Sequence, residues 1–181
     1  MSVFTNPASH SIEQARAYTA AILDLLGTSD PIAVLRATPD ALNRSIEHLT
    51  EHELSQPEAP GKWSIRQVLR HLADSDLVWG YRVRMVLAHD RPIITGYDQD
   101  LWADRLHYDQ APIDGSLEEF RVLRRSNLRL IAAASPADRE RVGVHAERGE
   151  ESVAHMIRLY AGHDLLHLGQ IERIRTALAR A

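Results

Sequence analysis

The sequence contains no cysteine, and Lys62 is the only lysine among its 181 residues. Without cysteine the chain cannot form a disulfide, present a thiolate to a metal ion or use a cysteine nucleophile. Any metal site must therefore be built from histidine, carboxylates and water. The remaining basic residues are arginines scattered among acidic residues, and the net charge is −4. This balance provides no basic field for a phosphate backbone, so we do not expect nucleic acid as a partner.

Long apolar runs are also missing from the sequence. No uninterrupted run approaches the roughly 18–20 residues that a membrane-spanning helix requires. The first residues, Met-Ser-Val-Phe-Thr-Asn-Pro, lack the positive and apolar regions of a secretory signal. We therefore expect a cytoplasmic protein without a membrane partner. With 44% hydrophobic residues, the chain is long enough for a substantial core, and we assign residues 1–181 to a single domain.

Helix starts are marked by capping boxes, in which a serine is followed three residues later by Glu or Gln. This pattern predicts starts at Ser11, Ser64 and Ser116, and a further helix begins near Ser152. Thr38-Pro39 is expected to interrupt the first helical arm. The predicted helical segments are 11–26 and 39–50, which form one broken arm with a short turn at 32–36 between them, then 65–88, 116–133 and 152 to nearly the C-terminus.

The pattern as a whole predicts an all-α helical bundle, because no stretch shows convincing strand alternation and no repeat is present. Spacing alone leaves the order of the helices open between an up-down arrangement and one with a crossover. The segment 91–112 is longer than an ordinary helix connection, which is typical of a functional loop. Its aromatic and acidic side chains have two possible roles, the wall of a pocket or a plug at one end of the bundle.

Two histidines interrupt the apolar stripe of the last predicted helix. His163 and His167 stand where Leu or Ile would continue the spacing, and side chains four apart lie on one helix face. Both imidazoles should therefore point into the protein, where two neighbouring rings compete for partners and are costly to protonate. A divalent metal would remove this difficulty. Histidines satisfied by carbonyls or water are the other interpretation, and periodicity does not decide between them.

A zinc-protease site does not fit this spacing well. The residue after His163 is Asp164, where that motif has the longer Glu, and no histidine follows His167. A third ligand would have to come from another helix. His71 is the best candidate because it lies beside the apolar face of the second long helix, although spacing alone makes it an ordinary boundary residue. His155 is rotated roughly 80° away from His163 and is left out.

Three stretches of the chain resemble the DinB-like (YfiT-like) metalloprotein superfamily, and they occur in the family's order. They are Gly61-Lys-Trp-Ser-Ile-Arg-Gln-Val-Leu-Arg-His71-Leu-Ala-Asp, Gly96-Tyr-Asp-Gln-Asp-Leu-Trp102 and Ala161-Gly-His163-Asp-Leu-Leu-His167-Leu-Gly-Gln-Ile171. The similarity extends from about Ile32 to Ala177. It implies a four-helix bundle with up-down-down-up connectivity, a short extra helix and a long loop between the second and third bundle helices, often as a homodimer. By motif match, the metal ligands implied are His71, His163 and His167.

The resemblance also implies a chemistry. Characterised relatives include transferases that use bacillithiol, mycothiol or glutathione, and a thiol-dependent maleylpyruvate isomerase. A three-histidine divalent metal, zinc or nickel being expected first, would activate a low-molecular-weight thiol or a water at an open coordination position, acting on a small-molecule substrate. Three alternatives stay open. They are a non-catalytic metal- or small-ligand-binding stress protein, a metal-dependent hydrolase with Asp164 as its only obvious base, and a simple scaffold bundle.

Further site residues are expected around the three histidines. The pocket residues, from segment 91–112 and from the turn before His163, are expected to be Tyr97, Asp98, Trp102 and Tyr160. Metal-ligating imidazoles usually donate their second N–H to an acceptor. The candidates for that supporting role are Asp74, Asp164 and Gln170. No arginine cluster stands out in the sequence as a clamp for a carboxylate.

Overall fold

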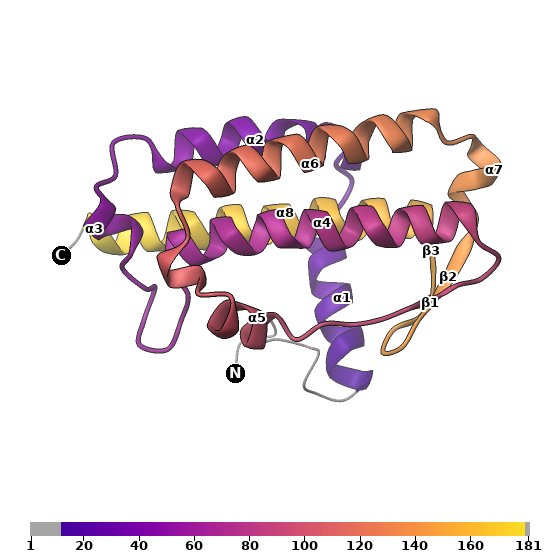
Figure 1. Cartoon of the computed structure of the whole chain (residues 1–181), viewed down its shortest axis with the longest axis horizontal. Coiled ribbons are helices and arrows are strands. Elements are labelled where there is room, and N and C mark those ends of the chain that lie inside the picture. The colour runs from indigo at the N-terminus through magenta and orange to yellow at the C-terminus, as the bar shows by residue number, and fades with distance from the viewer. Residues whose placement is uncertain (1–11, 180–181) are drawn as a thin grey trace.

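Four long helices form the bundle in the computed structural model, which describes residues 12–179 (Figure 1). They are α2 (Pro31–Ile46), α4 (Ile65–Ala88), α6 (Ile113–Ala133) and α8 (Val153–Leu178). In Figure 1 α2 runs to the left, α4 and α6 both run to the right, and α8 returns to the left. This is the up-down-down-up order, so the predicted bundle is confirmed. The extra helix, α1 (Ile12–Leu26), packs across α8 outside the bundle.

The connections contain more structure than the sequence indicated. They form α3 (Glu51–Leu54), β1 (Ile93–Ile94), α5 (Gln99–Arg105), the 3-10 turn η2 (Tyr108–Gln110), α7 (Pro136–Arg139), β2 (Val142–His145) and β3 (Gly149–Ser152). β1 pairs in parallel with β2, and β2 pairs antiparallel with β3. The expectation of no strands was therefore wrong. These strands have two to four residues, which is too short for a detectable alternation, and the partner of β1 lies far along the chain.

The capping patterns predicted some helix starts and missed others. Ser64 caps α4 through the expected box with Gln67, and Ser152 caps α8. Ser116 does not begin a helix, because α6 starts at Ile113 and Ser116 is buried within it. The helix extends further upstream because Ile113 packs into the apolar core. Ser11 lies outside the described residues.

The sequence suggested that Pro39 interrupts the first bundle helix. This was wrong, because Pro39 lies inside a continuous α2. A proline within a helix removes one backbone donor and displaces the carbonyl four residues earlier. That carbonyl belongs to Leu35, and it accepts a hydrogen bond of 2.9 Å from Nη1 of Arg124 on α6. The partner that the proline denies to Leu35 is thus supplied by another helix, a contact that local sequence cannot show.

The same guanidinium joins all four bundle helices. Arg124 is 1% exposed and donates to both oxygens of Asp164 on α8, at 2.5 and 3.0 Å. Its Nε lies 3.1 Å from Oδ1 of Asp76 on α4. One cation therefore faces two buried carboxylates. Burial raises the pKa of Asp76 to about 7, although the charge of Arg124 opposes this shift.

Within residues 12–179 the buried apolar side chains form three clusters: two along the bundle and a smaller one between α1 and α8. Of the two along the bundle, one contains Leu42, Leu69, Phe120 and Ile171, and the other contains Leu35, Trp79, Ile131, Met156 and Ala161. On α8, His163, Asp164 and His167 fall between the residues of these two clusters, so the polar groups form a layer in mid-bundle. Burying such groups is tolerated only if they are paired, which is the role of Arg124.

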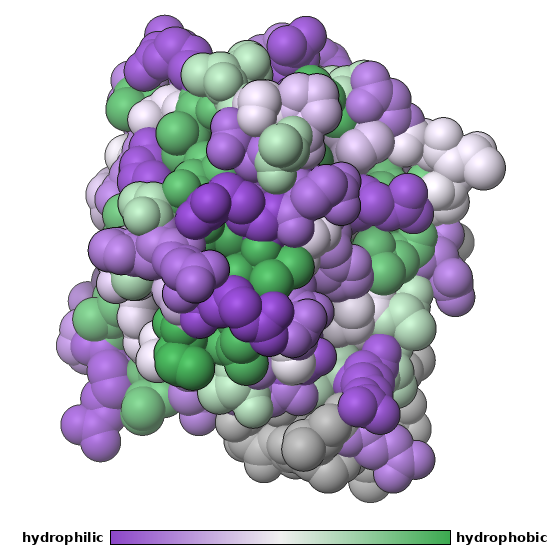
Figure 2. All heavy atoms as spheres, turned by 90° about the vertical axis from the view of Figure 1, so that its right-hand side faces the viewer, coloured by the Kyte–Doolittle hydropathy of each residue, from purple (hydrophilic) through white to green (hydrophobic). Residues whose placement is uncertain are grey.

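The surface mixes polar and apolar residues. Figure 2 views the end of the molecule that carries α7 and the β2–β3 hairpin, where polar side chains surround separate apolar patches. Within residues 12–179, no helix combines the length and apolar character that crossing a membrane requires.

Replacing Arg124 with Met should lower the free energy of unfolding by about 3–5 kcal/mol, because Asp164 and Asp76 lose their buried cation. The matched control is Arg125→Met, which removes an exposed arginine next to it and should change stability by no more than about 0.5 kcal/mol. Urea denaturation followed by circular dichroism measures both. Equal effects of the two variants would contradict a central role for Arg124.

Asp76→Asn should remove a specific pH dependence of stability. Between the ordinary aspartate pKa of 3.8 and the folded value of about 7, the folded state keeps a proton that the unfolded state has released. The free energy of unfolding of the wild type, relative to Asp76→Asn, should therefore fall as pH rises through this window and stay level above it. Denaturation at a series of pH values measures the difference, and a constant difference would contradict the raised pKa.

Candidate metal centre

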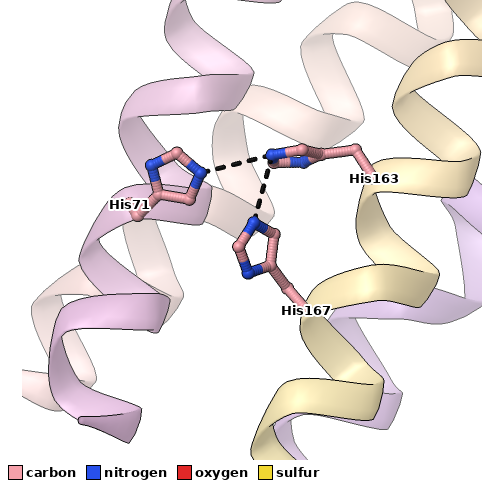
Figure 3. A group of neighbouring side chains, drawn as sticks. All are labelled: His71, His163 and His167. Carbon is pink, nitrogen blue, oxygen red and sulfur yellow. Dashed lines mark hydrogen bonds between the residues drawn. The ribbon is translucent and has the colours of Figure 1, made fainter. Parts of the chain in front are cut away.

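Three histidines from two helices converge in the polar layer of the bundle. His71 lies in the first third of α4, and His163 and His167 lie one turn apart on α8 (Figure 3). Nε2 of His163 is 3.2 Å from Nε2 of His71 and 3.2 Å from Nε2 of His167. One ring nitrogen from each residue lies within 4.8 Å of the others. The structure thus brings together the three residues that the family resemblance implied as ligands.

The three imidazoles are neutral in this environment. Burial lowers the pKa of His71 and of His163 well below the ordinary histidine value, and each is lowered further by a neighbouring histidine. Burial also lowers the pKa of His167 to about 4, although Gln170 and Asp164 act in the opposite direction. Each ring therefore keeps a nitrogen lone pair at neutral pH, which is the form that binds a metal.

Hydrogen bonds among the three histidines cannot satisfy all three Nε2 atoms, and the Nε2 of His71 is left with the Ser75 hydroxyl, 3.3 Å away. His167 donates from Nδ1 to Gln170, 2.9 Å away, so its Nε2 is an acceptor for the N–H of His163. His163 then has no lone pair left at Nε2 for His71, which lies equally close. A divalent ion accepting three lone pairs removes this conflict. Two nitrogens on one tetrahedral ion are roughly 3.3 Å apart. Two of the three nitrogen pairs here are 3.2 Å apart, and all three nitrogens lie within 4.8 Å of one another, so the donor set suits such an ion.

Of the three residues expected to orient the imidazoles, one contacts a histidine and two bind other residues. Gln170 contacts His167 as expected. Asp74 contacts none of the three, because its carboxylate accepts from Tyr108 and Arg70, both at 2.5 Å. Asp164 is held by Arg124 through both oxygens. Among the described residues, Nδ1 of His71 and Nδ1 of His163 have no hydrogen-bond partner.

Two neighbours of the centre were not predicted from the sequence. The Ser75 hydroxyl lies 3.3 Å from Nε2 of His71 and 3.1 Å from the Tyr97 hydroxyl. The Trp63 ring lies 4.8 Å from the His71 ring, centroid to centroid. Ser75 follows His71 by four residues, so helical spacing could have identified it. Trp63 precedes α4, and only the path of the chain brings it to the histidine.

A cavity of about 80 Å³ opens beside the histidines, and His163 lies in its wall. Of the expected pocket residues, Tyr97 and Tyr160 line it. Trp102 does not, but its ring packs on Tyr97 with centroids 4.5 Å apart. Asp98 also lies outside the lining, and its carboxylate caps α5 by accepting from the backbone N–H groups of residues 100 and 101.

Other residues of the cavity come from places that the sequence analysis did not connect with the site. Arg82 reaches it from α4, His145 and Arg148 from the β2–β3 hairpin, and Ile22 from α1. Two arginines therefore do gather at the site. Arg82 carried a signal, since it stands beside the apolar residues Trp79 and Val83 of the predicted helix. The hairpin residues carried none, because their approach depends on the pairing of β1 with β2.

Comparison with known proteins agrees with this geometry. A family model described as the DinB superfamily matches residues 34–171. The chain belongs to this superfamily. Proteins from Bacillus mycoides and Oceanobacillus iheyensis, both provisionally named metal-dependent hydrolases, are each 33% identical to it. The alignments cover 77% of this chain and 80% of the first relative, and 74% of this chain and 77% of the second.

One solved structure extends the comparison to the fold. YfiT from Bacillus subtilis, described as a probable metal-dependent hydrolase with an unusual four-helix bundle topology, superimposes with a TM-score of 0.78. The match covers 82% of this chain and 86% of that protein at 26% identity. The fold found here is therefore shared with a solved structure.

If the trio holds a metal, the wild-type protein should retain about one divalent ion per chain after incubation with zinc, nickel or manganese and removal of excess. His163→Ala should lose it, because two imidazoles remain. His155→Ala, on the same helix but outside the trio, is the matched control and should keep it. Elemental analysis of untagged protein measures the content. Equal metal in wild type and His163→Ala, or none in wild type, would contradict the site.

Proposed function

We propose that this protein is a metal-dependent enzyme in which His71, His163 and His167 hold a divalent ion, zinc or nickel first, beside a substrate cavity. The observation that carries the proposal is the convergence of three neutral imidazole nitrogens beside that cavity, with His163 in its wall. Such an ion, with a coordination position left open, makes a thiol or a water a stronger nucleophile at neutral pH. The names of the relatives support metal dependence.

We propose a low-molecular-weight thiol as the nucleophile, which makes the protein a transferase. The chain contains no cysteine of its own. Activation of water is usually assisted by a nearby general base. Asp164 and Asp74, the acidic residues nearest the histidines in sequence, are engaged by Arg124 and by Arg70 with Tyr108, respectively. A thiol is more acidic than water and depends less on such a base.

Hydrolysis is the second candidate, and the names of the relatives favour it. In either reaction, the hydroxyls of Ser75 and Tyr97 are the polar groups placed to move a proton away from the nucleophile. They contact each other at 3.1 Å, and Ser75 also contacts His71. Tyr97 lines the cavity, so this pair leads from the histidines toward the substrate side. Burial raises the pKa of Tyr97, which keeps its hydroxyl protonated and able to donate.

Two assays run in parallel test the proposal. The metal-loaded protein is given a small thiol with an activated alkyl halide, and separately an activated ester without thiol. We expect thiol-dependent transfer that falls to background in His163→Ala and after chelation, while His155→Ala retains it. Ester hydrolysis should stay at background.

The other outcomes separate the alternatives. Hydrolysis that requires the metal and His163 but no thiol would replace the transferase with a hydrolase. If neither reaction exceeds that of the chelated protein, nucleophile activation is wrong, and a non-catalytic metal-binding protein becomes the better interpretation.

A further inference from the structure

Arg82 is a buried cation without a matching anion. Its side chain is 7% exposed, and within residues 12–179 no carboxylate lies within ion-pair distance of it. Nη2 donates to the carbonyl of Thr95 at 2.7 Å, Nη1 to the hydroxyl of Tyr160 at 3.4 Å, and Nε has no partner. Both acceptors, the Thr95 carbonyl and the Tyr160 hydroxyl, are uncharged, so neither contact requires a cation. Buried charges are normally paired, so this guanidinium is suited to an anion from outside the chain.

A second unpartnered donor lies in the same cavity. His145 is 2% exposed, and its Nδ1 accepts the backbone N–H of Glu147 at 3.2 Å. In a neutral imidazole that contact puts the proton on Nε2. Among the described residues, this buried Nε2 has no hydrogen-bond partner. Both His145 and Arg82 line the cavity, so two unpartnered donor atoms, Nε of Arg82 and Nε2 of His145, belong to the walls of one pocket.

The position and size of the cavity connect these donors to the metal centre. Tyr160 lies between them, with its hydroxyl on Arg82 and its ring centroid 5.9 Å from that of His163. The cavity volume of about 80 Å³ is room for one small acidic group. A group held there would place the rest of its molecule within reach of the histidines.

We propose that this cavity binds an oxyanion, the carboxylate or phosphate group of the substrate or of the thiol, through Arg82 and His145. The inference deepens the proposed function by naming the chemical class of the molecule that the enzyme accepts. A planar guanidinium donates two parallel hydrogen bonds to either kind of group. The site requires only the cavity donors, so it can be tested without turnover.

The remaining charges of the cavity sharpen the proposal. Arg148 lines the wall, but its guanidinium is engaged by the buried carboxylate of Glu151 through contacts of 2.5 and 3.0 Å. Glu147 also lines the cavity, close to the backbone of Gly96, and forms no ion pair with Arg82 or Arg148. Its negative charge should weaken anion binding. Removing that charge should therefore tighten the site, which a generic loss of structure cannot do.

The test is a chemical-shift titration by heteronuclear NMR of the protein as purified and after chelation. Sodium acetate, sodium phosphate and the neutral acetamide are added at constant ionic strength. We expect saturable shifts around Tyr97 and His145 with acetate or phosphate, before and after chelation, and none with acetamide. The anion that binds with the higher affinity, acetate or phosphate, identifies the acidic group as a carboxylate or a phosphate.

Variants assign the binding to the cavity donors. Arg82→Gln should weaken anion binding at least about tenfold, as the loss of a charge-assisted pair requires, and Glu147→Gln should strengthen it severalfold. Arg84→Gln is the matched control, since Arg84 is also on α4 but contacts Gly80, Ser126 and Asn127 away from the cavity.

Three outcomes would overturn the proposal. They are no saturable shifts with either anion, anion binding that disappears on chelation, and affinities unchanged in both Arg82→Gln and Glu147→Gln. If Arg82→Gln fails to fold, Glu147→Gln decides. Anion binding that persists in a protein without catalytic activity would leave this site standing while the proposed reaction fails.

Discussion

The buried guanidinium of Arg124 is the interaction on which the geometry of the bundle depends. It donates hydrogen bonds to the carboxylates of Asp164 on α8 and Asp76 on α4, and to the backbone carbonyl of Leu35 on α2. Apolar faces alone allow helices to slide or rotate, because many packings bury similar areas. Directional hydrogen bonds to a buried charge do not allow this, because any shift leaves a charge without its partner. The four helices are therefore held in one register.

That register also sets the positions of the histidines. Asp164 follows His163 directly, so the contact that anchors α8 to Arg124 orients the neighbouring turn toward α4. The opposite side of this layer contains His71, whose ring meets those of His163 and His167. A polar layer in a bundle core opposes folding unless its members are paired. Here Arg124 pairs with the carboxylates of Asp76 and Asp164. The three histidines of the same layer are suited to a cation.

The helical parts of the structure were largely predictable, and the connections were not. The bounds of α4 follow from a capping box and a long apolar stripe, both of which are local properties. The continuity of α2 through Pro39 depends on Arg124, which is 85 positions away in sequence, and the small sheet depends on the pairing of Ile93 with Val144. The start of α6 at Ile113 is decided by burial rather than by capping. Each failure arose where a long-range contact outweighed a local preference.

The same division applies to the site. The sequence by itself determined the histidine pair on one helix face, because the spacing of His163 and His167 fixes their relative direction in any helix. Its resemblance to a family added His71. Only the tertiary structure decided that Asp74 and Asp164 serve other partners, and that Arg82 and His145 share a cavity. Those relations join residues on different elements, and the distance between such residues is set by packing and strand pairing, which no local pattern encodes.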